Sequence, residues 1–250
     1  MRLINTEIGR VIRLIPMEEI RPLGGLHLPT ALRMVSEQYG FSHTPDLLRN
    51  WEETQKDGLK FQLGKLVHGN RTINVIDFTL YNDGIVATSV STDDAELFLD
   101  DLMAWGKEVF GLREIDRTNV RTLYLSNVIV EFESSPDSLL KSFTILSESL
   151  AELLRTTYGL DLPVQLYGLG LHFDRTITVP AWQTITQFTL DRRINQPYSK
   201  NRFYSGAPLK TKDHLAFLEI IESTLNVDRR PSQRKGKKAS EILTSTGDGD

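Results

Sequence analysis

The stretch Phe78-Thr79-Leu80-Tyr81-Asn82-Asp83-Gly84-Ile85-Val86 places a tight-turn sequence, Asn82-Asp83-Gly84, between two runs of β-branched, aromatic and aliphatic residues. Asparagine, aspartate and glycine tolerate the backbone angles that a short turn requires, so this pattern predicts a β-hairpin. We therefore expect strands over residues 71–81 and 85–90. A further strand over residues 60–67 joins the same antiparallel meander.

A strand and two helices surround this meander. Residues 8–15 form a strand-like run that Pro16 ends, and a helix from about Thr30 stops at Tyr39-Gly40, where glycine readily adopts a left-handed C-cap. Thr92 is the expected N-cap of a second helix, with acidic residues in its first turn. One face of that helix is apolar at helical spacing: Phe98, Leu102, Trp105 and Val109.

The second half of the chain repeats this order. Residues 122–133 read as a strand, in which a change of apolar parity near Ser126-Asn127 predicts a β-bulge. A helix is expected to begin at Ser135-Pro136-Asp137 and to end at Tyr158-Gly159. The remaining expected elements are strands over residues 163–172 and 184–191 and a last helix from Thr211.

Four short matches connect the two halves in the same order. They are Tyr39-Gly40-Phe41 with Tyr158-Gly159-Leu160, Gln62-Leu63-Gly64 with Gln165-Leu166-Tyr167-Gly168, Phe78-Thr79-Leu80 with Phe188-Thr189-Leu190, and Thr92 with Thr211. Where their spacing changes, the change falls in an expected loop or hairpin. We interpret the chain as an internal duplication, with a first module over residues 1–118, a second over residues 119–227 and a disordered basic tail over residues 228–250.

The predicted fold class is α+β, with two pseudo-repeated β-α-β-β-(β)-α modules whose antiparallel sheets carry helices on one face. Ile76, Phe78 and Leu80 are expected on one side of their strand, and Asp77 and Thr79 on the other, more polar side. If the two sheets join, their free face forms a broad, partly polar saddle. Such a saddle resembles the TATA-box-binding protein in outline, although no sequence motif of that family is present. Two separate ferredoxin-like modules are the alternative.

Residues 78–86, together with Tyr204-Ser205-Gly206-Ala207-Pro208 ahead of Asp213-His214-Leu215, resemble a sporadically distributed family of uncharacterised bacterial proteins of similar length. The resemblance extends over most of the chain. It implies a prokaryotic origin and no particular activity.

Charge is distributed unevenly along the 250 residues. The formal net charge of −4 combines a tail over residues 229–250 that carries +3 with a preceding body that carries −7. The chain contains no cysteine, which excludes disulfides and thiolate chemistry, and no apolar run long enough to cross a membrane. Its first residues lack the unbroken apolar segment of a secretory signal. We expect a cytoplasmic protein.

Catalytic and ligand-binding motifs are scarce. No metal-ligand spacing occurs among the five histidines, His27, His43, His68, His172 and His214. Gly168-Leu169-Gly170 lacks the third glycine and the following helix of a dinucleotide site. We therefore expect no metal and no cofactor, and we favour a protein without enzymatic activity. The remaining catalytic hypothesis is that His172, Asp174 and His214 converge in a pocket.

The predicted loop over residues 191–212 is the most informative segment, because it is long for a connection within a domain. It interleaves basic and aromatic side chains: Arg192, Arg193, Tyr198, Lys200, Arg202, Phe203, Tyr204, Lys210 and Lys212. Such residues could contact phosphates and stack on bases, could supply a protein interface, or could form an ordered cover over a sheet edge. The sequence leaves these three interpretations open.

The tail adds six basic residues with almost no apolar content: Arg229, Arg230, Arg234, Lys235, Lys237 and Lys238. It is expected to be disordered. From these features we expect a non-enzymatic interaction or adaptor subunit of a larger prokaryotic assembly, which binds a protein partner or forms a homo-oligomer through the loop and the tail. A nucleic-acid-binding protein that uses the loop, the tail and the free sheet face is the alternative.

Overall fold

The computed structural model describes residues 1–15, 17–45, 57–115, 120–133, 141–159, 161, 164, 166–172 and 186–227. The chain divides into two compact units, Met1–Glu133 with Tyr167–Glu219, and Ser134–Leu166 with Ile220–Asp250. The first unit contains all the described strands, and the second contains the helix α5 (Lys141–Tyr158).

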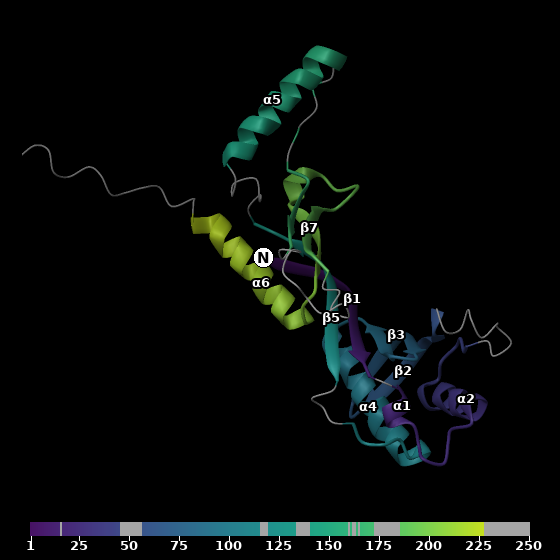
Figure 1. Cartoon of the computed structure of the whole chain (residues 1–250). Helices are drawn as coiled ribbons and strands as arrows, with labels where there is room; N and C mark the ends of the chain where they lie inside the picture. The colour runs from purple at the N-terminus through teal and green to yellow at the C-terminus, as the bar shows by residue number, and fades with distance from the viewer. Residues whose placement is uncertain are drawn as a thin grey trace, which may run out of the picture. The chain divides into compact units, whose positions relative to one another are not determined.

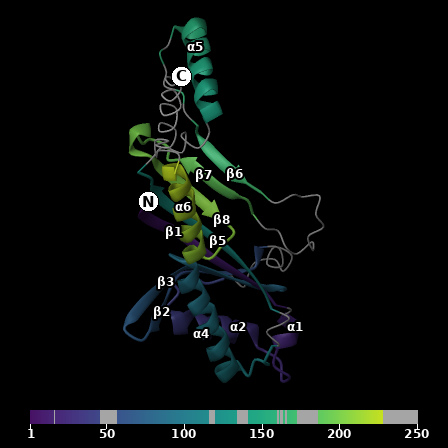
Figure 2. The same cartoon turned by 90° about the vertical axis from the view of Figure 1, so that its left-hand side faces the viewer.

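A single antiparallel sheet of eight strands forms the framework of the first unit (Figures 1 and 2). Its order is β2-β3-β4-β1-β5-β8-β7-β6, with β1 and β5 paired at the centre. The expected α+β class is confirmed, and the strands of both halves share one sheet. The strands are β1 (Arg2–Leu14), β2 (Leu59–His68), β3 (Arg71–Tyr81), β4 (Gly84–Ser89), β5 (Arg121–Glu131), β6 (Gly168–Leu171), β7 (Phe188–Arg192) and β8 (Arg202–Ala207).

The order of the strands is the same when it is read outward from the central pair. On one side β1 is followed by β4, β3 and β2, and on the other side β5 is followed by β8, β7 and β6. In each half, therefore, the last strand lies next to the first, and the second strand forms the outer edge. An internal duplication as the origin of this order stays a prediction.

The helices of the first unit pack on one face of the sheet. α1 (Met17–Ile20), α2 (Leu28–Tyr39) and α4 (Thr92–Phe110) lie over the first half, and α6 (Thr211–Val227) begins over the second. Directly opposed residues of neighbouring strands share a face. Phe61, Phe78 and Ala87 are opposed in this way and buried, and the ring of Phe98 in α4 meets that of Phe78 edge-on, with centroids 5.6 Å apart. This face therefore holds the core.

Most local signals in the first half are confirmed. α2 ends at Tyr39, and Gly40 adopts the left-handed angles φ 57° and ψ 40°. The Asn82-Asp83-Gly84 turn joins β3 to β4 as expected. The N-cap of α4, however, is Ser91 rather than Thr92, because the Ser91 hydroxyl accepts a hydrogen bond from the Asp94 backbone N–H at 3.1 Å. Thr92 is the first residue inside the helix.

The expected loop over residues 191–212 is wrong. The segment continues β7 to Arg192, forms a short 3-10 turn over Tyr198–Lys200 and then enters β8, which pairs with both β5 and β7. β8 reads Arg-Phe-Tyr-Ser-Gly-Ala, so only two of its residues have a strong preference for strands. Ser205 and Ala207 occupy fully buried positions where a large apolar residue is expected in a strand. Because these side chains are small, the sequence pattern does not indicate a strand here.

The expected bulge near Ser126-Asn127 lies instead in the neighbouring strand. The pairing with β5 is irregular in β1, over Leu3–Asn5 and again over Thr6–Ile8. The apolar parity of β5 changes because Leu123 and Leu125, before Ser126, face away from the helices, whereas Val128 and Val130, after it, face the core. A similar irregularity in β3 leaves Ile76 37% exposed, whereas Phe78, which was expected on the same side of the strand, is buried.

In the second unit, α5 ends at Tyr158, and Gly159 has a φ of 69°, as the sequence predicts. The expected helix start at Ser135 lies outside the described residues. Four apolar side chains of α5 are between 47% and 65% exposed: Ile145, Leu146, Leu150 and Leu153. Among the described helices, none is long and apolar enough to span a membrane.

Candidate functional site

The candidate residues in the segment 191–212 include two that are buried. Arg192 and Phe203 are 3% and 2% exposed. The guanidinium carbon of Arg192 lies 4.6 Å from the centroid of the Tyr198 ring and 5.0 Å from that of Phe203, so the cation stacks on two aromatic rings. Its Nη1 donates to the Tyr198 carbonyl at 3.3 Å. Arg192 thus fixes the connection between β7 and β8.

Other basic residues of this segment form ion pairs within the first unit. Arg202 Nε donates to Glu131 Oε2 at 2.7 Å, and Arg2 Nη2 donates to Glu131 Oε1 at 2.8 Å. The hydrogen bond from Arg202 holds the pKa of Glu131 below its usual value. Arg193 lies 3.7 Å from Glu7. Much of the positive charge that the sequence assigns to this segment is therefore balanced internally.

The remaining candidates are exposed or lie elsewhere. Tyr198 is 38% exposed, and Lys200 has no ion-pair partner in the described part of the chain. Burial, together with the carboxylates of Glu7 and Asp191, raises the pKa of the half-buried Tyr204. The six basic tail residues from Arg229 to Lys238 lie outside the described residues.

The face of the sheet opposite to the helices, called the open face below, has an apolar centre. Ile12 of β1 is directly opposed to Val86 of β4 and to Leu123 of β5, which places these three side chains on one face. The helices of the first unit pack on the other face. We define the apolar centre by five half-buried residues: Ile12, Leu14, Val86, Leu123 and Leu125.

Polar residues surround the apolar centre and bond to one another. On the side of the first half, Arg10 Nε donates to Thr88 Oγ1 at 3.0 Å, and Thr88 Oγ1 donates to Asp77 Oδ1 at 3.1 Å. On the other side, the Glu131–Arg202 pair shares the face with Asp191, whose pKa is raised by burial. The open face therefore combines an apolar centre with a rim of balanced charges.

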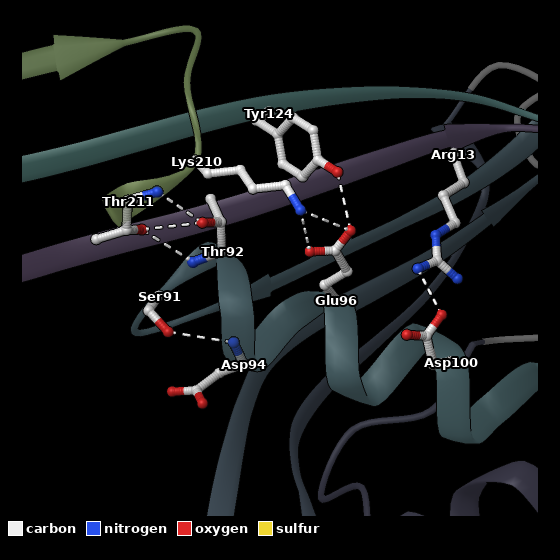
Figure 3. A network of polar contacts seen from close by, with 9 residues as sticks. All are labelled: Arg13, Ser91, Thr92, Asp94, Glu96, Asp100, Tyr124, Lys210 and Thr211. Atoms are coloured by element: carbon white, nitrogen blue, oxygen red, sulfur yellow. Dashed lines mark hydrogen bonds and ion pairs between the residues drawn. The ribbon is translucent and has the colours of Figure 1, made fainter. Parts of the chain in front are cut away.

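The first residues of α4 and α6 meet above the central strand pair (Figure 3). The Thr92 N–H donates to Thr211 Oγ1 at 3.0 Å, and the Thr211 N–H donates to Thr92 Oγ1 at 2.7 Å. Ser126 Oγ of β5 lies 3.3 Å from the same Thr211 oxygen. Beneath α4, a side chain at Gly9 of β1 would collide with the backbone of Ser91 and Thr92. The absence of a side chain at Gly9 therefore allows the start of α4 to pack closely against β1.

A charged cluster beside this meeting point joins the two helices. Lys210, which directly precedes α6, donates to both carboxylate oxygens of Glu96 in α4, at 2.8 and 3.2 Å, and the Tyr124 hydroxyl donates to the same carboxylate at 2.8 Å (Figure 3). Partial burial alone would raise the pKa of Glu96, but these hydrogen bonds outweigh it and lower the pKa. The hydrogen bond to Glu96 raises the pKa of Lys210. The cluster stabilises both ionised forms.

A serine–histidine pair lies in the core of the second half. His214 is fully buried, and its Nε2 lies 2.9 Å from Ser205 Oγ. The Ser205 hydroxyl donates to the Thr189 carbonyl at 2.7 Å, so Nε2 is the donor towards Ser205 and cannot remove its proton. Burial lowers the pKa of His214 to about 4. This pair is a neutral packing element rather than a nucleophile with its base.

The catalytic hypothesis on His172, Asp174 and His214 stays untested, because Asp174 lies outside the described residues. Of these residues, His172 is exposed, whereas His214 is enclosed in the core. Within the described ranges, no group of three or more histidine, aspartate or glutamate side chains could hold a metal ion.

Sequence reasoning missed the apolar centre, although a signal for it was present. The change of apolar parity in β5 reflects residues such as Leu123 and Leu125 that face away from the core, and it was read as a bulge. The contact between the starts of α4 and α6 had a signal too, in the matched positions of Thr92 and Thr211. No protein-family model matches the chain, and no curated protein matches its sequence.

Proposed function

We propose that the protein is a non-enzymatic interaction subunit of a larger prokaryotic assembly and binds another protein through its open face. The observation that carries this proposal is the apolar centre on the side of the sheet opposite to the helices. Protein interfaces combine an apolar middle with a polar rim, which is the arrangement of this face. The basic tail remains part of the proposal as a contact to an acidic region of the partner.

The charge on the open face favours a protein over a nucleic acid. Arg10 is hydrogen-bonded to Thr88, which is itself bonded to Asp77, and Arg202 is paired with Glu131. A surface that binds phosphates needs cations in excess of nearby carboxylates. Here both signs alternate around an apolar middle, which fits a protein surface with a similar mixture.

The test compares two leucine-to-arginine substitutions in the full chain. Leu125→Arg places a charge in the apolar centre, whereas Leu23→Arg changes a leucine that is 92% exposed in the loop between α1 and α2. Each tagged variant is expressed in its native cells, and the proteins that co-purify at stoichiometric amounts are identified. Circular dichroism checks that both variants are folded.

We expect a stoichiometric partner to co-purify with the wild type and with Leu23→Arg and to be lost with folded Leu125→Arg. A chain that purifies alone at cellular concentration contradicts the proposal, and so does a partner that Leu125→Arg retains. Nucleic-acid binding remains the alternative prediction. It requires an affinity for duplex DNA that falls by about 0.9 log units per phosphate contact for each log unit of salt.

A further inference from the structure

A cleft of about 710 Å³ opens beside α4, on the helix-bearing side of the sheet. The ends of β1 and β5 contribute Arg13 and Thr122, α4 contributes Asp100 and Lys107, and the segment after α4 contributes Arg113. A volume of this size is within the range of small-molecule sites in proteins.

Arg13 is the cation of the cleft best placed to bind a ligand. Its side chain is only 12% exposed, and its Nη2 lies 2.7 Å from Asp100 Oδ1 (Figure 3). Within the described part of the chain, its Nε and Nη1 make no hydrogen bond. Asp100 is 65% exposed and can turn into solvent, so the guanidinium can exchange this carboxylate for that of a ligand.

The other two cations of the cleft are less suited to hold a ligand. Lys107 is 57% exposed and pairs with Glu114 at 3.3 Å, and Arg113 is bound to the backbone, since its Nε donates to the Arg21 carbonyl at 2.8 Å. The charged lining residues number three of each sign: Arg13, Lys107 and Arg113 against Glu96, Asp100 and Glu114. When Asp100 turns into solvent, three cations face two carboxylates, and a monoanion neutralises this excess of one positive charge.

A half-open apolar cavity of about 90 Å³ lies next to the cleft and is lined by residues of the core of the first half. Met103 and Leu112 line both spaces. Methionine is flexible and adapts to neighbouring shapes. Leu112 packs against Gly106, where a Cβ would lie 2.7 Å from its Cδ1. The remaining lining of the cavity is entirely apolar, including Leu28, Leu32 and Trp105.

We propose that the cleft and the apolar cavity together bind a small amphipathic monocarboxylate. The carboxylate pairs with Arg13 in place of Asp100, and a short aliphatic or aromatic tail passes Met103 and Leu112 into the apolar cavity. Arginine matches a planar carboxylate with two parallel hydrogen bonds, which a hydroxyl or ammonium group cannot form.

The test titrates the full-length protein with hexanoate and with two neutral or cationic analogues, hexan-1-ol and hexylamine, and follows binding by calorimetry. Three variants probe the site: Arg13→Gln removes the guanidinium, Asp100→Asn removes the competing carboxylate, and Leu112→Trp fills the route to the apolar cavity. Arg33→Gln, on the exposed side of α2, is the matched control. Acetate serves as the ligand without a tail.

We expect saturable binding of hexanoate and none of hexan-1-ol or hexylamine. Arg13→Gln weakens hexanoate at least about tenfold, the size expected for a lost hydrogen bond between charged groups. Asp100→Asn tightens hexanoate, Leu112→Trp removes its advantage over acetate, and Arg33→Gln changes nothing. The absence of saturable hexanoate binding overturns the proposal, as does equal binding of hexan-1-ol. If Arg13→Gln does not fold, Asp100→Asn decides, because unchanged or weaker binding contradicts exchange of the carboxylates.

Discussion

Thr92 and Thr211 each accept a hydrogen bond on their hydroxyl oxygen from the backbone N–H of the other, at 2.7 and 3.0 Å. The first N–H groups of a helix have no partner within the helix, so each helix here caps the other. Both residues are buried, at 0% and 6% exposed. The pair ties the two halves of the helix layer together above β1 and β5.

Substitution of either threonine by valine is expected to lower the free energy of unfolding by about 1–2 kcal/mol, because a buried N–H loses its acceptor. The double variant should lose less than the sum of the two, since each single substitution already breaks part of the same pair. Denaturant unfolding of the four proteins measures the coupling. Thr72→Val, at an exposed position of β3, is the control. Strictly additive losses would show that the two residues act independently.

Gly9→Ala is expected to destabilise the protein by about 1–3 kcal/mol, because the added methyl group overlaps the backbone at Ser91 and Thr92. Gly24→Ala provides a matched control, since a Cβ there meets no atom within 4 Å. Its effect should stay within about 0.5 kcal/mol. Thermal or denaturant unfolding compares the two, and equal effects would rule out a close approach of α4 to β1.

The buried His214 makes stability depend on pH. Its pKa of about 4 in the folded protein is below the unfolded value, so the unfolded chain binds the proton more readily. The stability that the neutral, buried His214 contributes is fully present above pH 6.5, declines as the pH falls and is lost by pH 4. The free energy of unfolding should therefore fall by about 2 kcal/mol between pH 7 and pH 5. Across this pH window, the free energy of unfolding of His214→Gln should depend less steeply on pH than that of the wild type. An unchanged dependence in that variant contradicts the assignment.

Arg192 is expected to act on stability rather than on binding. Arg192→Ala removes the cation stacked on Tyr198 and Phe203 and should cost about 2 kcal/mol or more. Arg192→Lys should recover little of this loss, because an ammonium group lacks the planar surface of a guanidinium. Denaturant unfolding measures both, with exposed Arg33→Ala as the control. If Arg192→Ala is as stable as the wild type, the structural role is contradicted, and Arg192 becomes a candidate for contact with a ligand.

The elements predicted correctly are those with strong local chemistry. The turn at Asn82-Asp83-Gly84 and the left-handed Gly40 follow from backbone preferences that act over a few residues. β8 was missed because its small residues, Ser205 and Ala207, are specified by their neighbours in the sheet rather than by their own preference for strands.

The candidate site was less predictable, because sequence shows which charges are present but not which are paired. Arg202 reads as a free cation in a basic segment, yet its partner Glu131 is 71 residues away. The position that corresponds to Phe78 also depends on pairing. Gly9 and Ser126 are opposed at the centre of the sheet and pair outward with Ser89 and Ala207, so Ala87 corresponds to Ser205. Phe78 is opposed to Ala87 and Leu190 to Ser205, so Phe78 corresponds in the sheet to Leu190 rather than to Phe188.

The most direct test of the proposed function is site-specific photo-cross-linking in native cells, with p-benzoylphenylalanine placed at Leu125 in the apolar centre or at Leu23 as the exposed control. We predict a discrete cross-linked product with one other protein from position 125 and none from position 23. If position 125 gives no cross-linked product, or cross-links only to a second copy of this chain, the proposal of an interaction subunit that binds another protein through its open face is contradicted.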